Sequence, residues 1–241
     1  MRRLRLLGSV AFDRRLGRIM ATYAVSALTE MGTWVAITVW AFQRGGVAEA
    51  GLAGFVQLVP AALIAPLAGY AGDRFRRDVV YAVGLALVGG SSIATGAAMI
   101  AEAPAVVVYA LGAVTASAIT VGRPAIGGLL PAVAENPEKL TAGNALVEMI
   151  DNAGMFAGPA VAAALLAVAS EGAVFAVLGA ATLLASTVAI VRTDQALLRP
   201  TGGLEELGVL DEIRGGIKTA ASDSGVATVL GLMILLVFVA G

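Results

Sequence analysis

The sequence predicts an all-α integral membrane protein, a bundle of six transmembrane helices followed by the start of a seventh. Of its 241 residues, 59% are hydrophobic and only 14% are charged, whereas a soluble domain averages about 45–50% apolar and about 25% charged residues. Apolar stretches long enough to cross a bilayer also recur along the chain, and basic residues gather between alternate stretches. Such a chain cannot cover itself with polar surface, which favours a lipid environment.

The apolar stretches define the expected elements, since a transmembrane helix needs about 20 mostly apolar residues. A further stretch, 226–241, would give about 24 Å of helix at 1.5 Å per residue, less than the bilayer core of about 30 Å, so the sequence is expected to end inside a helix. We expect the bundle over 1–192, a cytoplasmic linker with a possible surface helix over 193–224, and the start of the seventh helix over 225–241. The six expected spans are 16–42, 48–70, 79–101, 104–121, 141–169 and 172–191.

The basic residues predict the orientation, because short loops rich in Lys and Arg stay in the cytoplasm. Arg44 is the one basic residue expected on the opposite side. We therefore expect a multi-pass protein of the cell inner membrane with a cytoplasmic N-terminus. The basic residues expected on the cytoplasmic side are Arg2, Arg3, Arg5, Arg14, Arg15, Arg18, Arg74, Arg76, Arg77, Arg123, Lys139, Arg192, Arg199, Arg214 and Lys218.

Several classes of function lose their usual residues. The chain has no cysteine and no histidine, which removes thiolate and imidazole metal sites and His-dependent nucleophile systems. The sequence contains no recognisable nucleotide-binding loop, and its basic residues form no surface suited to nucleic acid. We expect no enzyme, no cofactor and no nucleic-acid partner, and carboxylates remain as the groups able to exchange protons.

Three carboxylates lie within apolar spans, where acids are costly and usually face a cavity or a partner. Glu30 lies deepest, near the bilayer middle, and is the leading candidate for a proton site. Glu148 and Asp151 are three residues apart and so lie on one helix face. They are interpreted equally well as transport residues or as acids that are solvated at the interface or paired with Arg123. Gln57 is a weaker candidate for the cavity wall, with a helix-to-helix hydrogen bond as its alternative.

Two motifs carry a family resemblance. The segment from Gly69 to Arg77 reads GYAGDRFRR and resembles the signature between the second and third helices of the major facilitator superfamily, with an Asp-Arg-Phe-x-Arg form similar to its macrolide and siderophore efflux branch. The matching or small residues, Gly69, Gly72, Asp73, Arg74 and Arg77, are expected to form a cytoplasmic gate. The alternative is an ordinary basic cytoplasmic loop.

The second motif lies in the fifth span. Gly154, Gly158 and Pro159 are similar to the Gly-x-x-x-Gly-Pro core in the fifth helix of the superfamily's exporters. Small residues one turn apart let helices approach closely, and a proline removes a helical hydrogen bond. An ordinary small-residue helix contact would explain the glycines alone.

The resemblance implies one half of a transporter, a bundle of two inverted three-helix repeats with substrate bound near the midplane. The implied activity is proton-coupled efflux of a hydrophobic or amphipathic small molecule, of drug, macrolide or siderophore class, by alternating access. The implied partners are substrate, protons, lipid and a second half, supplied by the same chain or by a homodimer. The alternatives are a non-transporting sensor or scaffold and an inactive half-transporter fragment.

Overall fold

The computed structural model describes residues 13–134 and 136–189 and a few positions between 215 and 232. Within the first range, the side chain of Asp73 is not described. The chain divides into two compact units, residues 1–200 and 201–241, and the fold below is that of the first. The expected linker and seventh helix fall almost entirely outside the described residues.

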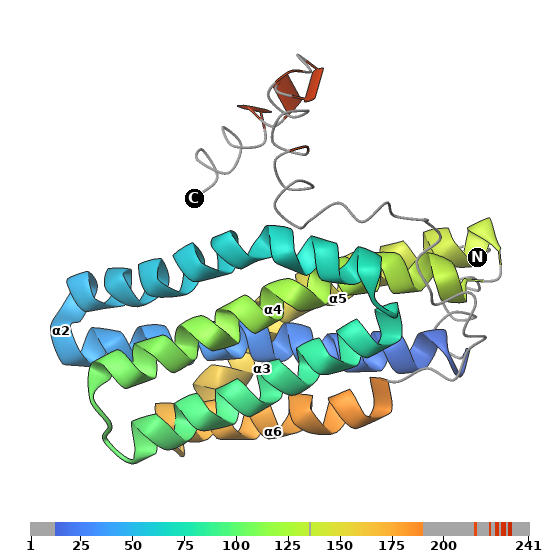
Figure 1. Ribbon diagram of the computed structural model, residues 1–241. Helices are drawn as coiled ribbons and strands as arrows, with labels where there is room; N and C mark the ends of the chain where they lie inside the picture. The colour runs from blue at the N-terminus through green and yellow to red at the C-terminus, as the bar shows by residue number, and fades with distance from the viewer. Residues whose placement is uncertain are drawn as a thin grey trace. The chain divides into compact units, whose positions relative to one another are not determined.

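The described part of the first unit consists of five long apolar helices (Figure 1). Six transmembrane helices were expected, and two of the expected spans, 16–42 and 48–70, both lie within the first of these five helices, α2. Their order is α2 (Leu16–Arg74), α3 (Arg77–Ile100), α4 (Ala105–Val133), α5 (Pro137–Leu166) and α6 (Glu171–Ala189).

Helix α2 folds back on itself at two glycines (Figure 1). Gly45 and Gly46 have non-helical backbone angles, and Gly46 has φ +66° and ψ −150°, a region that is nearly restricted to glycine. We call residues 16–44 the first arm of α2 and residues 47–74 its second arm.

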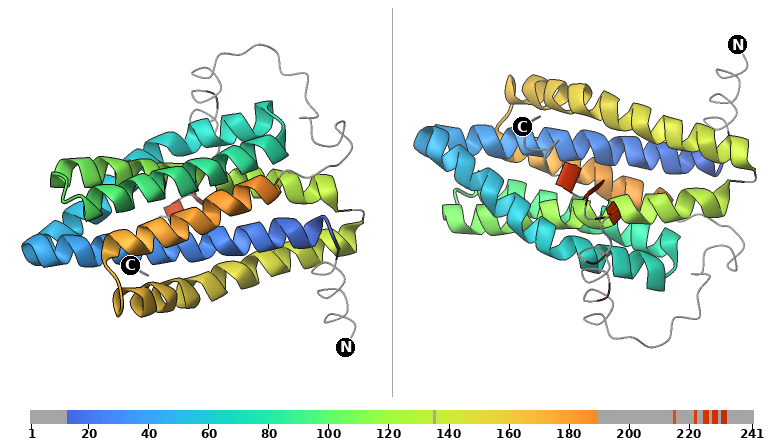
Figure 2. Two further views of the ribbon diagram at one scale, coloured as in Figure 1. Left: turned by 90° about the horizontal axis from the view of Figure 1, so that it is seen from below. Right: turned by 90° about the horizontal axis from the view of Figure 1, so that it is seen from above.

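The first arm of α2 lies inside the bundle (Figure 2). Helix α2 contacts α4, α5 and α6, while α3 packs mainly against α6 and α4. Helix α5 packs against α2 and touches α4 and α6 only slightly. Two clusters of buried apolar side chains fill the bundle, one around Tyr81 and Leu129 and the other around Ile37 and Phe175.

Glycines bring α3 and α6 into close contact. A Cβ built at Gly89 would lie 2.6 Å from the amide nitrogen of Leu183 and 2.8 Å from the carbonyl oxygen of Gly179. A Cβ at the adjacent Gly90 would meet nothing within 4 Å. Only glycine therefore fits at position 89, where α3 meets α6, as expected where small residues set the distance between membrane helices.

Helix α4 is longer than the expected span 104–121. It continues to Val133 and contains Pro124 and Pro131, because a membrane helix can continue through proline when neighbouring groups satisfy the freed backbone. Arg123, expected in the loop after this span, therefore lies inside the helix, about 15 Å from its end by the rise of 1.5 Å per residue. This correction brings a positive charge into the bundle.

The start of α5 follows the sequence closely. The side chain of Asn136 accepts a hydrogen bond from the backbone nitrogen of Lys139 at 2.8 Å, Pro137 takes the first helical position, and Glu138 lies in the first turn. These are the preferred residues of a helix N-terminus. The ammonium group of Lys139 also lies 3.1 Å from Asp13, which joins the start of α5 to the start of α2.

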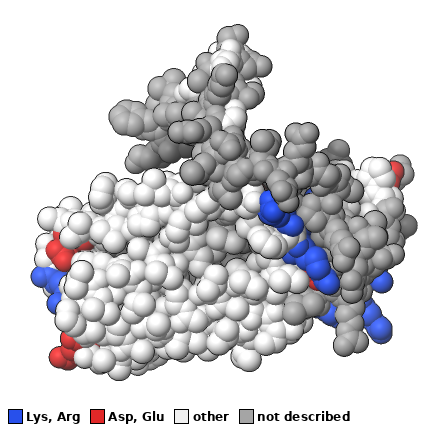
Figure 3. All heavy atoms as spheres, viewed as in Figure 1, with Lys and Arg blue, Asp and Glu red and all other residues white. Residues whose placement is uncertain are grey.

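Charged side chains lie near the two ends of the bundle, with an uncharged band between them on the face in Figure 3. Basic residues such as Arg14, Arg76 and Lys139 are near helix ends on one side. The other end carries Arg44, Glu102 and Glu171. An apolar band between charged ends fits a protein that crosses a membrane.

Candidate functional site

Glu30 and Arg123 form a partly exposed ion pair between two helices of the bundle. The Nη2 atom of Arg123 donates to both carboxylate oxygens of Glu30, at 3.0 and 3.1 Å. The side chains are 25% exposed for Glu30 and 54% exposed for Arg123. The pair links the first arm of α2 to α4, two segments 93 residues apart in the sequence.

Asp151 lies beside this pair but has a different partner. The hydroxyl of Tyr23 donates to Oδ1 of Asp151 at 2.7 Å, which joins α2 to α5. Asp151 and Arg123 are close enough to interact electrostatically and line the same cavity. Glu30, Arg123, Tyr23 and Asp151 thus form one polar cluster on three helices, which we call the central cluster.

Two cavities adjoin the central cluster and share Glu30, Met31 and Arg123 as a wall. The first cavity, of about 170 Å³, lies between the two arms of α2 and α4. The second cavity, of about 220 Å³, lies between the first arm, α4 and α5. The first is lined by Glu30, Met31, Thr33, Trp34, Gln57, Leu58, Ala61, Thr115, Ala116, Ile119, Thr120 and Arg123, and the second by Ala27, Glu30, Met31, Arg123, Asp151 and Met155.

Gln57 lines the first cavity. Its Nε2 donates to the carbonyl oxygen of Ala53 in the same helix, at 3.2 Å. The helix-to-helix hydrogen bond considered as its alternative role is not among the hydrogen bonds of the described residues.

Glu148 lies apart from the cavities. Its side chain is exposed, and its backbone carbonyl accepts from the amide of Asn152 at 2.7 Å. Arg123 forms its ion pair with Glu30 in the described structure. The pairing of Glu148 or Asp151 with Arg123, considered from the sequence, is not among the ion pairs of the described residues.

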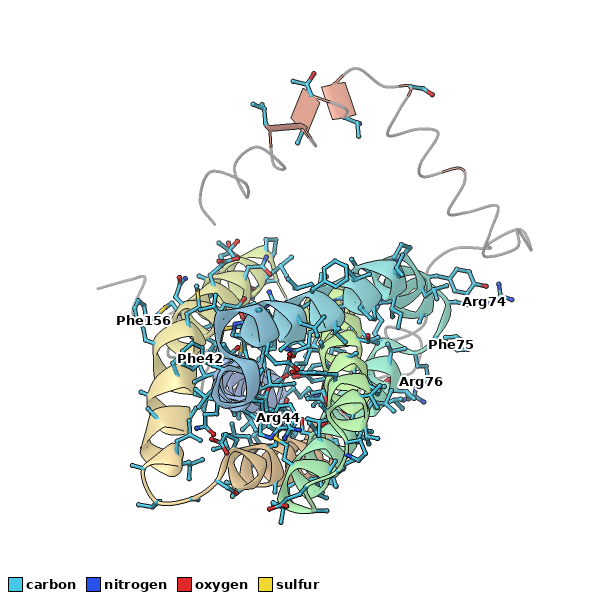
Figure 4. The ribbon with its side chains drawn as sticks, turned by 90° about the vertical axis from the view of Figure 1, so that its left-hand side faces the viewer. Phe42, Arg44, Arg74, Phe75, Arg76 and Phe156 are labelled. Atoms are coloured by element: carbon cyan, nitrogen blue, oxygen red, sulfur yellow. The ribbon has the colours of Figure 1, made fainter. Side chains whose placement is uncertain are left out.

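The residues of the expected gate lie at the end of α2. A Cβ at Gly69 would meet nothing within 4 Å, so this glycine does not mark a close helix contact in the described structure. The guanidinium of Arg74 lies 5.7 Å from the ring centre of Tyr70, and Arg74, Phe75 and Arg76 project outward (Figure 4). The side chain of Asp73 and the surroundings of Gly72 lie outside the described part of the structure.

The remaining basic residues of this segment are anchored to α3 and α4. Arg76 donates through Nε and Nη2 to the two oxygens of Asp78, at 3.2 and 2.9 Å, and Asp78 is fully buried. This hydrogen-bonded carboxylate raises the pKa of Arg76 above its usual value. The side chain of Arg77 approaches Gly128, where a Cβ would lie 3.0 Å from Arg77 Cδ.

The fifth-span motif forms the contact between α5 and the first arm of α2. A Cβ at Gly154 would lie 3.0 Å from the Cβ of Ala27, and one at Gly158 would lie 3.1 Å from the backbone nitrogen of Gly32. Pro159 lies within α5, which continues to Leu166. The two glycines therefore hold α5 next to the segment that carries Glu30.

A second polar cluster, at the α2 turn, was missed by sequence reasoning. The hydroxyl of Tyr109 donates to Glu49 at 2.7 Å, Trp40 meets Tyr109 edge to face with ring centres 5.6 Å apart, and Arg44 lies 4.6 Å over Trp40. Arg44 and Phe42 are seen at this end in Figure 4. These contacts fix the turn of α2 against the start of α4.

Tyr23 was also missed, although a signal was present. Tyr23 and Glu30 are seven residues apart, two turns of a helix, so both lie on the same face of the first arm. The partner on α5 is 128 residues away, and no spacing rule connects the two.

Comparison with known proteins identifies the family. The family model described as Major Facilitator Superfamily matches residues 19–241. The chain belongs to the major facilitator superfamily. Members of this superfamily are generally membrane transporters, and the five apolar helices of the described part fit a multi-pass membrane protein of this kind. No curated protein and no solved structure matches the chain.

Proposed function

We propose that this superfamily member is a proton-coupled exporter of hydrophobic or amphipathic small molecules that works by alternating access. The observation that carries the proposal is the ion pair between Glu30 and Arg123, which joins the first arm of α2 to α4 and lies in the wall shared by two cavities. Ionisable groups at membrane depth usually mark substrate or proton pathways.

The geometry gives each residue of the pair a role. Ionised Glu30 accepts both contacts of Arg123 at 3.0 and 3.1 Å. Protonation removes the charge of Glu30 and weakens the ion pair, so that Arg123 turns toward Asp151, which lines the same cavity. The proton on Glu30 thereby changes the charge and the shape of both cavities at once.

The bundle geometry suits movement of α5 together with the first arm of α2. These segments meet through Gly154 and Gly158, and small-residue contacts let two membrane helices pack closely, so the two segments can move as one body. We place the end that carries Arg76 and Lys139 in the cytoplasm, following the bias of basic residues. The second arm of α2, separated from the first by the turn at Gly45 and Gly46, completes six membrane spans, which we interpret as two inverted three-helix repeats.

The exposed apolar face of the second arm of α2 and α5 indicates which partners cover the bundle. The second arm and α5 expose large apolar residues, among them Phe55, Leu63 and Phe156. We propose that lipid and a second transporter half, from the same chain or from a second copy, cover this face. Residues 193–224 form the linker and 225–241 begin the seventh helix in this proposal.

The experiment is a coupled transport assay in proteoliposomes with an imposed pH gradient, using ethidium as the amphipathic probe. The Glu30→Gln variant is expected to insert normally and to lose proton-coupled transport, because the amide carries no proton to release. Glu148→Gln is the matched control, since it removes an acid from an exposed position outside the cavities. Coupled transport by Glu30→Gln at the wild-type rate would refute the proposal.

A further inference from the structure

The two cavities carry unequal charge. Their walls contain two carboxylates, Glu30 and Asp151, and one basic residue, Arg123. Arg123 is already bound to both oxygens of Glu30, whereas Asp151 accepts from the neutral hydroxyl of Tyr23. With both acids ionised, the described walls carry one excess negative charge, and it resides on Asp151.

The surroundings of Asp151 suit an organic cation. The second cavity is otherwise lined by Ala27, Met31 and Met155, and thioether side chains are polarisable and adapt to irregular ligands. A small metal ion prefers several oxygen ligands, and no group of three or more acidic residues that could hold a metal ion occurs in the described part of the chain. A cation with an apolar surface fits these walls better.

The first cavity suits the apolar body of such a ligand. It is lined by Trp34, Leu58 and Ile119, and the indole of Trp34 is partly exposed. The two cavities meet at Met31 and the ion pair. Asp151 lines the second cavity and not the first, so the charged end of the ligand is expected in the second cavity and its apolar body in the first.

We propose that the paired cavities bind a monovalent organic cation with an apolar body, with its charged end at Asp151 and Tyr23 as the positioning residue for that carboxylate. This inference rests on the proposed function, because it takes the cavities to be the place where the transported molecule binds. In this proposal, Asp151 on α5 determines that the ligand is a cation, whereas Glu30 on α2 carries the coupled proton.

The test measures equilibrium binding of tetraphenylphosphonium and tetraphenylborate, two ions of similar shape and opposite charge. The full chain is held in lipid nanodiscs at one pH, and binding to empty nanodiscs is subtracted. Saturable binding of the cation is expected, with affinity lowered about tenfold or more in Asp151→Asn, because a charge at ion-pair distance in a partly buried site interacts strongly. Tetraphenylborate is expected to show no saturable binding.

Three further variants separate charge from folding. Glu148→Gln should change the affinity by less than about twofold, since exposed charges contribute little. Asp151→Glu should keep binding because it keeps the charge, and Tyr23→Phe should weaken binding by several-fold while leaving the preference for the cation. If Asp151→Asn fails to fold, Asp151→Glu and Tyr23→Phe decide the result.

Either of two results would overturn the inference: tetraphenylborate binding as tightly as the cation, or folded Asp151→Asn binding the cation with unchanged affinity. Because no pH gradient is applied, this outcome is independent of the Glu30 transport assay. A chain that binds the cation through Asp151 while Glu30→Gln still couples would refute the proton role alone. Loss of coupling in Glu30→Gln with no charge preference in binding would refute the cation site alone.

Discussion

Adjacent glycines of α3 should respond in opposite ways to the same substitution. In Gly89→Ala the new methyl group would lie 2.6 Å from the nitrogen of Leu183 and 2.8 Å from the oxygen of Gly179. Both neighbours are backbone atoms of α6, so the helices must separate to admit it. In Gly90→Ala the methyl group meets nothing within 4 Å.

The expected change in the free energy of unfolding follows from two opposing contributions. Alanine is favoured over glycine inside a helix by about 0.8–1.0 kcal/mol, and this gain applies at both positions. Overpacking a close contact costs about 1–3 kcal/mol, and this cost applies at Gly89 alone. We therefore expect Gly90→Ala to be stabilised by up to about 1 kcal/mol and Gly89→Ala to be less stable than Gly90→Ala by about 1–3 kcal/mol.

The assay is unfolding in mixed detergent micelles, followed by the loss of helical circular dichroism. A double variant, Gly89→Ala with Gly179→Ala, should be less destabilised than the sum of the single variants, because the first methyl group already separates the helices. Equal stability of Gly89→Ala and Gly90→Ala would refute the close contact between α3 and α6.

Two further outcomes concern the turn within α2 and the residue Asp13, which lies just before its start. Gly46→Ala should lower the stability by about 1–3 kcal/mol, because alanine is strained at φ +66° and ψ −150°. Gly51→Ala, which lies in regular helix, should not lower it, and equal unfolding midpoints for the two variants would contradict this prediction. Burial raises the pKa of Asp13, but hydrogen bonds from the backbone of Arg15 and from Lys139 outweigh it, and the net pKa lies below 3.8. Asp13 therefore stabilises the fold above about pH 4, and this contribution is lost as the pH falls through the lowered pKa. Asp13→Asn should be less stable than wild type at pH 7, and the difference should shrink as the pH falls below about 4; a stability difference that does not change with pH would rule out the contribution of this carboxylate.

Composition and local signals predicted the membrane helices well. The Asn136–Pro137–Glu138 segment has the residues preferred at a helix N-terminus, and α5 begins there, because the cap depends only on neighbouring residues. The double glycine at 45–46 separates two apolar stretches, and the backbone changes direction there. Such features are local, so a sequence records them directly.

The partners within the candidate site could not be predicted in this way. Arg123 was expected in a loop because the apolar stretch of the fourth span ends at 121, yet α4 continues past it to Val133. Its pairing with Glu30 depends on the rotation of two helices far apart in sequence. Tyr23, Glu49 and Tyr109 contact distant residues for the same reason, and no periodicity in one helix identifies a partner on another.

The attachment of α5 has a practical consequence for following movement. This helix packs against α2, while its opposite side exposes residues such as Phe156, which is 81% exposed and points away from the bundle in Figure 4. The chain contains no cysteine, so one thiol introduced at 156 and another on the first arm of α2 would be the only thiols available to spectroscopic labels. A pair of spin labels at these places would report, on one distance scale, whether α5 travels with the first arm of α2 or separates from it.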